Sequence, residues 1–456
     1  MQLGRSYSVN IPRANGKFVR KYPALAQVPF ILDSRPAYHR AANAYLIDRA
    51  LGLWSPDPHT GTSLGRILSP KTTLSYAQWL ANFLEWAEVR SIDLLHCTYS
   101  MHLAGQYQSE MLQGLWSADG KSLSSGTVNP RVQQACDFIH WMIRTGLRTA
   151  AFEVPYTTAR VKIGSANNAV GHLGREVLVR EGKARKVTQS LQIPTDVQVK
   201  NWLERIHKRY GTTVDLMCQT VLLTAMRREE VVCVRKDTLP LNPTDWVIAN
   251  PIAPESEREV RIAIQYGTKG PTYGLNNGDK IGPSREILIP LSLAKKWHYY
   301  RQKERSFAFA KWMLGYKNEA ARRARADDSV HLFLRDSDGV RFEGFEFYDA
   351  WTGVELPIKG WSPHKGRHWW ACSILWRELK KYENIGPLSN ETAAALIENS
   401  ALSIIRLQIQ PQLGHAGTDT TMIYLRWVMD MLSRPLSLDE DTDNAMEMRW
   451  QPGDSE

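Results

Sequence analysis

The chain has 456 residues, 43% of them hydrophobic, and a formal net charge of +10. This length suffices for two or three domains that each bury a core. No stretch approaches the roughly 20 continuous apolar residues that a membrane-spanning helix needs, so we expect no membrane contact. Residues 1–6 lack the apolar run of a signal peptide, and we expect the protein to stay in the cytoplasm.

The charge is distributed unevenly along the chain. Residues 436–456 form an acidic C-terminal tail with seven acidic residues and one arginine, which leaves about +16 on residues 1–435. Such a basic body favours a polyanionic partner, nucleic acid above all. The five cysteines are scattered and form no Cys-x-x-Cys pair, which predicts reduced core thiols and neither a zinc site nor a disulfide framework.

The first 152 residues are predicted to form two regions. Residues 1–65 are rich in Pro, Asn and Arg, with one helix expected near residues 38–51. They form an N-terminal extension, either a solvated leader or an arm that contacts DNA. Residues 66–152 carry apolar stripes with helical spacing at 74–87 and 128–143, with another helix expected over 99–116, and predict a compact helical domain.

Residues 153–194 have the composition of a linker, with four glycines and a basic cluster. Their charge suits a strap across a phosphate backbone, although a merely solvated linker explains it nearly as well. The candidate DNA-binding residues of this strap are Arg175, Arg180, Lys183, Arg185 and Lys186.

Residues 195–435 read as a mixed domain. Helices are expected at 195–210, 213–226 and 293–326, β-structure at 246–290, and a strand-like piece at 331–334. The whole chain is therefore predicted to be α+β and mainly helical, with a small β-sheet.

Three short pieces near the C-terminus could carry chemistry. His364 and Arg367 are three residues apart, project from one face of a helix, and could reach the same anion. His415 follows a glycine that suits a helix end, and Tyr424 lies on the second turn of a helix that Asp419 or Thr420 can cap. A cation, imidazoles and a phenol together suit a tyrosine attacking a phosphate diester, because fixed donors can neutralise the charge that gathers in the transition state.

The order and spacing of these pieces resemble the tyrosine recombinase (phage integrase) family. The pieces are His-x-x-Arg-His at 364–368, Leu-Gly-His at 413–415, and Thr-Thr-x-x-Tyr at 420–424. The family also has an upstream arginine with a carboxylate three residues later, matched by Arg227 and Glu230, and a hairpin lysine, matched by the lysine of Gly-Thr-Lys-Gly at 267–270. Five motifs in this order are a strong signal, whereas any one alone is weak.

The resemblance implies a role for each matching residue. Arg227 and Arg367 would clamp the non-bridging oxygens of the scissile phosphate, and His415 would donate to the remaining oxygen. Lys269 would protonate the departing 5′ oxygen, and Tyr424 would be the nucleophile.

Two further residues support this set. His364 would hydrogen-bond and could take the proton from Tyr424, and Glu230 would orient the site from its edge. His368 and Trp369 are expected to pack or support rather than react.

Some assignments stay open. Arg228 competes with Arg227, but its partner three residues later would be Val231. Lys280 is the alternative to Lys269, because the predicted hairpin is longer than in the family. Residues 377–400 look like an insertion, and Pro411 interrupts the helix that leads to the Gly-His pair.

The activity that the resemblance implies is site-specific DNA recombination or integration through a 3′-phosphotyrosine intermediate. The helical domain 66–152 would clamp double-stranded DNA beside the catalytic domain 195–435, and a homo-tetramer would act on paired sites, with accessory proteins possible. Bond energy is kept in the covalent intermediate, so no cofactor or metal is implied. The alternatives are a relaxing enzyme like a type IB topoisomerase, and a non-catalytic DNA-binding accessory protein on the same fold.

Overall fold

The computed structural model describes residues 7–12, 15–56, 67–161, 175–185, 191–268, 279, 281–380, 399–414 and 423–427. These residues form two compact units, one within residues 1–163 and 172–189 and the other from residue 190 onward. None of the described helices is long and apolar enough to cross a bilayer.

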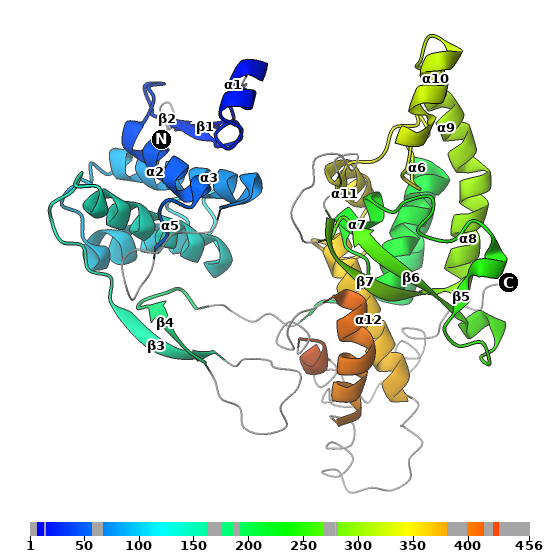
Figure 1. The fold of residues 1–456 in the computed structure, drawn as a ribbon. Helices are drawn as coiled ribbons and strands as arrows, with labels where there is room; N and C mark the ends of the chain where they lie inside the picture. Colours follow the sequence, from blue (N-terminus) through cyan, green and yellow to red (C-terminus); the bar gives the residue numbers. More distant parts are fainter. Residues whose placement is uncertain are drawn as a thin grey trace, which may run out of the picture. The chain divides into compact units, whose positions relative to one another are not determined.

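The N-terminal unit is mainly helical (Figure 1). Its elements are β1 (Ser8–Asn10), α1 (Gly16–Lys21), β2 (Phe30–Leu32), α2 (Arg40–Leu51), α3 (Pro70–Val89), the π-helix η1 (Tyr99–Gln108), α4 (Ser109–Gln113), α5 (Ser125–Arg144), β3 (Tyr156–Val161) and β4 (Arg175–Arg180). Helix α3 begins before the predicted stripe at 74–87, because the Ser69 hydroxyl accepts from the Thr72 amide at 3.2 Å and Pro70 starts the first turn. The predicted apolar stripes on α3 and α5 face the core of this unit.

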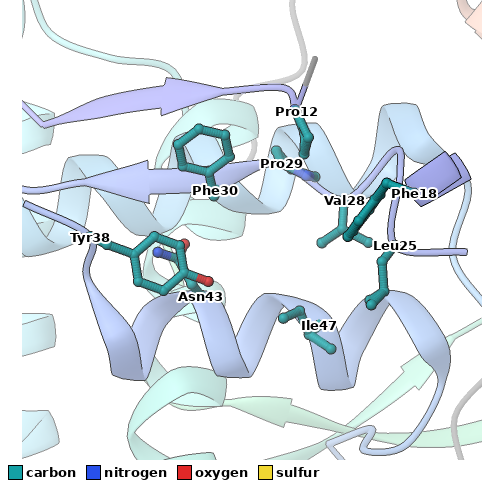
Figure 2. A pocket seen from close by; sticks show the side chains of 9 residues that line it. All are labelled: Pro12, Phe18, Leu25, Val28, Pro29, Phe30, Tyr38, Asn43 and Ile47. Carbon is teal, nitrogen blue, oxygen red and sulfur yellow. The ribbon is translucent and has the colours of Figure 1, made fainter. Parts of the chain in front are cut away.

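The N-terminal segment shares that core. Tyr45 and Leu46 of α2 are fully buried, and Ile31 of β2 packs with them. Beside them is an apolar pocket of about 370 Å³ (Figure 2), lined by Pro12, Phe18, Leu25, Val28, Pro29, Phe30, Tyr38, Asn43 and Ile47. Residues 28–54 thus contribute to a packed unit, although they were predicted as an extension or arm.

The segment predicted as a linker contains regular structure. Strands β3 and β4 pair antiparallel, from Tyr156 opposite Arg180 to Val161 opposite Arg175. Two strands of six residues separated by a glycine-rich stretch carry too little periodicity for the sequence to reveal the pairing.

The C-terminal unit combines helices with a three-stranded antiparallel sheet in the order β5-β6-β7. Its main elements are α6 (Asp196–Thr224), α7 (Arg228–Val232), β5 (Val247–Ile248), β6 (Glu259–Tyr266), β7 (Ile281–Pro290), α8 (Leu291–Gln302), α9 (Glu304–Leu314), α10 (Glu319–Arg325), α11 (Gly344–Thr352), α12 (Pro363–Lys380), the π-helix η5 (Ile405–Ile409) and α14 (Gln410–Leu413). The prediction of a mainly helical α+β fold with a small sheet is confirmed.

Local differences from the predicted elements have physical causes. The helices expected at 195–210 and 213–226 are the two parts of α6 and meet at Gly211, whose φ of 78° and ψ of −174° are not helical, so the predicted break is present. The helix expected over 293–326 is divided into α8, α9 and α10. The strand-like piece at 331–334 makes only isolated bridges, from His331 to Arg235 and from Leu334 to Arg341.

Helix α12 is held close to the centre of this unit. It packs on α6, and a Cβ added at Gly366 would lie 2.9 Å from the Trp351 ring. Trp351 in turn packs against Trp202 of α6 and Trp361, and all three indoles are buried. The arginine that follows Gly366 therefore enters the interior of the unit.

Gly267 fixes the end of β6 against the start of α7. Its φ is +74°, and an added Cβ would lie 2.3 Å from the carbonyl oxygen of Glu229. We predict that Gly267→Ala lowers the free energy of unfolding by about 3 kcal/mol or more, because backbone strain and a clash with fixed backbone add. Gly360→Ala is the matched control, since Gly360 has a φ of +72° and its nearest foreign atom is the flexible Lys365 Nζ at 3.5 Å.

Urea denaturation of both variants checks this prediction. The control should lose about 1 kcal/mol, the cost of the left-handed backbone alone. Equal losses in the two variants would show that the approach of β6 to α7 is not tight.

Candidate functional site

Arg227 and Glu230 lie at the junction between α6 and α7. Helix α6 ends at Thr224, Ala225 adopts a left-handed φ of 54°, and Arg227 is the N-cap of α7. The Arg227 amide donates to Glu230 Oε2 at 2.7 Å, and Arg227 Nη1 donates to Oε1 at 2.7 Å. Backbone and side chain of the arginine are thus held by one carboxylate.

Arg228 takes no part in this arrangement. Its Nη2 donates to Glu229 Oε1 at 2.7 Å, and its guanidinium lies 5.8 Å from the centre of the Tyr348 ring. Of the two competing arginines, the structure therefore brings Arg227 to Glu230.

Arg285 of β7 is a third member of the group, although no sequence motif predicted a role for it. Its guanidinium holds both oxygens of Glu230, through Nη1 to Oε1 and through Nη2 to Oε2 at 2.9 Å. A signal was present, because Arg285, Ile287 and Ile289 alternate on the buried face of the strand. An arginine in such a register needs a buried partner.

The turn at residues 412–414 brings Arg227 and Arg367 together. Arg227 Nη2 donates to the carbonyls of Leu413 and Gly414 at 3.0 and 2.9 Å, and Arg367 Nη2 donates to the Leu413 carbonyl at 2.7 Å. Gly414 ends α14 with a φ of +62°. Segments that lie 140 and 186 residues apart in sequence thus converge on one carbonyl.

Gln412 anchors this turn. Its buried side chain donates to the carbonyls of Thr224 and Leu288 at 2.9 and 2.7 Å and accepts from the Leu288 amide at 3.0 Å. The interruption expected at Pro411 does not break a helix, because Pro411 occupies the first turn of α14, directly after the π-helix η5. A proline is tolerated in the first turn.

Arg367 is a buried cation with unused hydrogen-bonding capacity. Arg367 is 3% exposed, and its Nη1 has no acceptor among the residues that the structure describes. Burial, and next the positive charge of Arg227, lower the pKa of Arg367 to about 10. An anion placed at Nη1 would satisfy the donor and restore the ordinary pKa.

Tyr424 is fully buried beside α12. His368 Nδ1 lies 2.9 Å from the Tyr424 hydroxyl, and the rings of His368 and His364 are 4.6 Å apart. Burial raises the pKa of Tyr424 above its ordinary value, Cys372 adds to the shift, and Arg367 opposes it. The histidine in contact with the phenol is therefore His368, which is compatible with a supporting role, while His364 is exposed.

Glu230 is ionised despite complete burial. Burial opposes the charge, but the hydrogen bonds and charges of Arg285 and Arg227 outweigh it and hold the pKa of Glu230 below its ordinary value. The site therefore has a fixed negative centre between two guanidiniums.

Several predicted residues lie outside the described residues. They are Lys269, its alternative Lys280, His415, Lys186, most of the insertion (381–398) and the acidic tail.

Within the basic cluster, Lys183 and Arg185 are exposed, and only the backbone of Arg175 is described. Arg180 is corrected from the DNA-binding set, because it is 4% exposed and donates to Tyr99 and Gln108 inside the N-terminal unit.

A second buried carboxylate lies between the two candidate lysines in sequence. Asp279 accepts from Arg341, from Arg235 at 3.2 Å, from His331 at 2.9 Å and from the Cys233 thiol at 3.4 Å. Burial opposes its charge, but these partners, His331 first, keep the pKa of Asp279 below its ordinary value. This cluster ties the segment before β7 to the body of the unit.

No family model and no curated protein matches the sequence. Among solved structures, the XerH site-specific recombinase bound to its difH substrate is 16% identical, with 83% of this chain and 81% of that chain covered and a TM-score of 0.42. The Tn1549 transposon integrase in complex with circular intermediate DNA is 14% identical, with 80% and 94% covered and a TM-score of 0.41.

A third similar solved structure is also that of a recombinase. The XerA recombinase also matches, at 14% identity with 90% of this chain and 99% of that chain covered and a TM-score of 0.29. At these identities and TM-scores the matches assign no activity, and the case for one rests on the side chains.

The Glu230 ion pairs should dominate the local stability. We predict that Glu230→Ala lowers the free energy of unfolding by about 3–5 kcal/mol at pH 7, because it leaves buried guanidiniums facing each other without a counter-charge. The pKa of Glu230 is depressed in the folded state, so its contribution is present above the unfolded pKa of about 4.5 and is lost as the pH falls through the folded value.

Glu286→Ala is the control, because the ion pair of Glu286 with Arg261 is exposed and should be worth at most about 1 kcal/mol. Denaturant titrations of both variants and the wild type between pH 7 and pH 3 check this. A Glu230→Ala deficit that does not shrink at acid pH would contradict an ionised Glu230.

Proposed function

We propose that the protein is a site-specific DNA recombinase that cleaves and rejoins strands through a 3′-phosphotyrosine intermediate. The observation that carries the proposal is the buried Arg367 Nη1, which lacks an acceptor among the described residues and lies in one cluster with Arg227 and Tyr424. A buried cation without its full set of acceptors is unfavourable in the free protein and becomes favourable when an anion binds.

The guanidiniums fit a phosphate. Arg227 and Arg367 both donate to the Leu413 carbonyl, so their donors converge on one oxygen-sized position. In the complex, oxygens of the scissile phosphate would take over from the carbonyl oxygens of the turn. Guanidinium groups suit this exchange because their paired N–H donors match phosphate geometry.

The phenol supplies the nucleophile. Tyr424 Oη would attack the phosphorus, and the bond from phosphorus to the 5′ oxygen would break as the new bond forms. The phenolic proton would pass to His368 Nδ1, 2.9 Å away, because the raised pKa of Tyr424 keeps the hydroxyl protonated until attack. His364, expected from the sequence for this role, would act next to His368.

The remaining roles come from the motif match. Lys269, with Lys280 as the alternative, would protonate the leaving 5′ oxygen, and His415 would donate to the phosphate. Glu230 would orient Arg227, as its two hydrogen bonds to that residue suggest.

The partner we propose is double-stranded DNA, held by the C-terminal unit and by the helical N-terminal unit, with exposed Lys183 and Arg185 at the phosphate backbone. A homo-tetramer on paired sites would carry out the exchange, with accessory proteins possible. Bound in this way, the protein would associate with the nucleoid, and integration or excision of a mobile element would be its setting.

A nicked suicide substrate tests the chemistry, because loss of the short 5′-hydroxyl fragment traps the covalent intermediate. We predict a covalent protein–DNA adduct with the wild type on a cognate site, and a loss of more than about 1,000-fold in its rate of formation with Tyr424→Phe. Tyr348→Phe is the matched control, because Tyr348 is a partly exposed tyrosine of α11 in the same unit that stacks on Arg228.

Mass spectrometry of the digested adduct should locate the nucleotide on Tyr424. An adduct on another tyrosine, or one that persists in Tyr424→Phe, would overturn the assignment of the nucleophile. Sequence-specific binding by the wild type without any adduct would favour a non-catalytic accessory protein.

A further inference from the structure

A buried arginine of β7 stands outside the roles assigned so far. Arg285 occupies the position on the strand where the alternation with Ile287 and Ile289 places an apolar side chain. Only 15% of its side chain is exposed, and its Nε has no acceptor among the described residues. Burying a guanidinium is costly, so its presence needs a compensating interaction.

That interaction is with the carboxylate that also holds Arg227. Glu230 Oε1 accepts from both Arg285 and Arg227, and Glu230 Oε2 accepts from Arg285 Nη2 and from the Arg227 amide. One negative charge is therefore shared between two guanidiniums. Each of them keeps part of its positive charge uncompensated.

The turn at Gly414 is shaped around the same side chain. A Cβ added at Gly414 would lie 3.0 Å from both Cδ and Nε of Arg285 and 3.4 Å from Arg227 Nη1. Glycine there lets the turn that supplies the Leu413 and Gly414 carbonyls lie directly against both arginines. Arg285 thus touches the carboxylate that positions Arg227 and the turn that Arg227 and Arg367 bind.

The charges of the group can be compared with those of the reaction. Arg227, Arg285 and Arg367 carry three positive charges and Glu230 carries one negative charge, so these four side chains together carry +2. A phosphodiester carries one negative charge, and its pentavalent transition state gathers a second. Without Arg285, the three remaining side chains would together carry +1. The whole negative charge of Glu230 would then offset the positive charge of Arg227.

We propose that Arg285 is a positioning residue of the phosphate site. Its positive charge offsets part of the negative charge of Glu230, so that the charge of Arg227 stays available to the dianionic transition state. This inference rests on the proposed function. Arg285 does not touch the phosphate and acts through Glu230 and the Gly414 turn. Its removal therefore weakens the chemical step more than the binding of DNA.

The test compares Arg285→Met with Arg285→Lys, which have similar volumes and differ in charge. DNA affinity and the single-turnover rate of adduct formation are measured for each on the nicked substrate. We expect both variants to bind DNA within about 3-fold of the wild type. Arg285→Met should form the adduct about 100-fold more slowly, and Arg285→Lys should lose no more than about 10-fold.

A second substrate separates charge from packing. A methylphosphonate at the scissile position removes one negative charge, so the deficit of Arg285→Met relative to the wild type should shrink to less than about 10-fold on it. Equal losses in the two variants, or an unchanged methionine deficit on the neutral substrate, would overturn the proposal and leave Arg285 a structural residue. Absence of an adduct with the wild type would instead overturn the proposed function itself.

Discussion

The C-terminal unit depends on one buried carboxylate shared between two guanidiniums. Glu230 is fully buried and joins α7, through Arg227, to β7, through Arg285. The same arginines reach the turn at residues 412–414, at the end of α14, which also binds Arg367 of α12. Four elements from distant parts of the sequence are thus connected through charged hydrogen bonds, which are stronger than neutral ones and require a defined geometry.

This network is surrounded by tight backbone packing. Gly267 lets the end of β6 approach α7, Gly414 lets the turn approach Arg285, and Gly366 lets α12 approach Trp351. Asp279 is a second buried carboxylate that connects separate segments. It fixes the segment before β7 through Arg235, Arg341 and His331. Buried charges and close backbone contacts together place Arg367 and Tyr424 in the interior. There, Arg367 keeps a donor without an acceptor among the described residues, and Tyr424 keeps its phenolic proton.

The sequence predicted much of this arrangement and missed parts of it for identifiable reasons. Helical spacing revealed α3 and α5, and motif spacing selected Arg227, Glu230, Arg367 and Tyr424, which the structure brings to one region.

The residues that it missed carry at most a weak local signal, such as the place of Arg285 in the alternation of its strand. Arg285 lies within an ordinary strand, and Gln412 acts through carbonyls from two distant segments. The choice between His364 and His368 depends on the rotation of α12 relative to Tyr424, which spacing alone does not determine. The pairing of β3 with β4 was missed because strand pairing is a long-range property that the sequence pattern of two short strands does not reveal.

The central claim is that two arginines, brought together by a shared turn, form one phosphate site. An experimental structure of the protein bound to a cognate duplex with Tyr424→Phe, which blocks cleavage, tests it most directly. The account predicts that Arg227 and Arg367 each donate to non-bridging oxygens of the same phosphate at about 3 Å, with residue 424 on the opposite side from the 5′ oxygen. A scissile phosphate bound away from either arginine, with both still on the carbonyls of the turn, would contradict it.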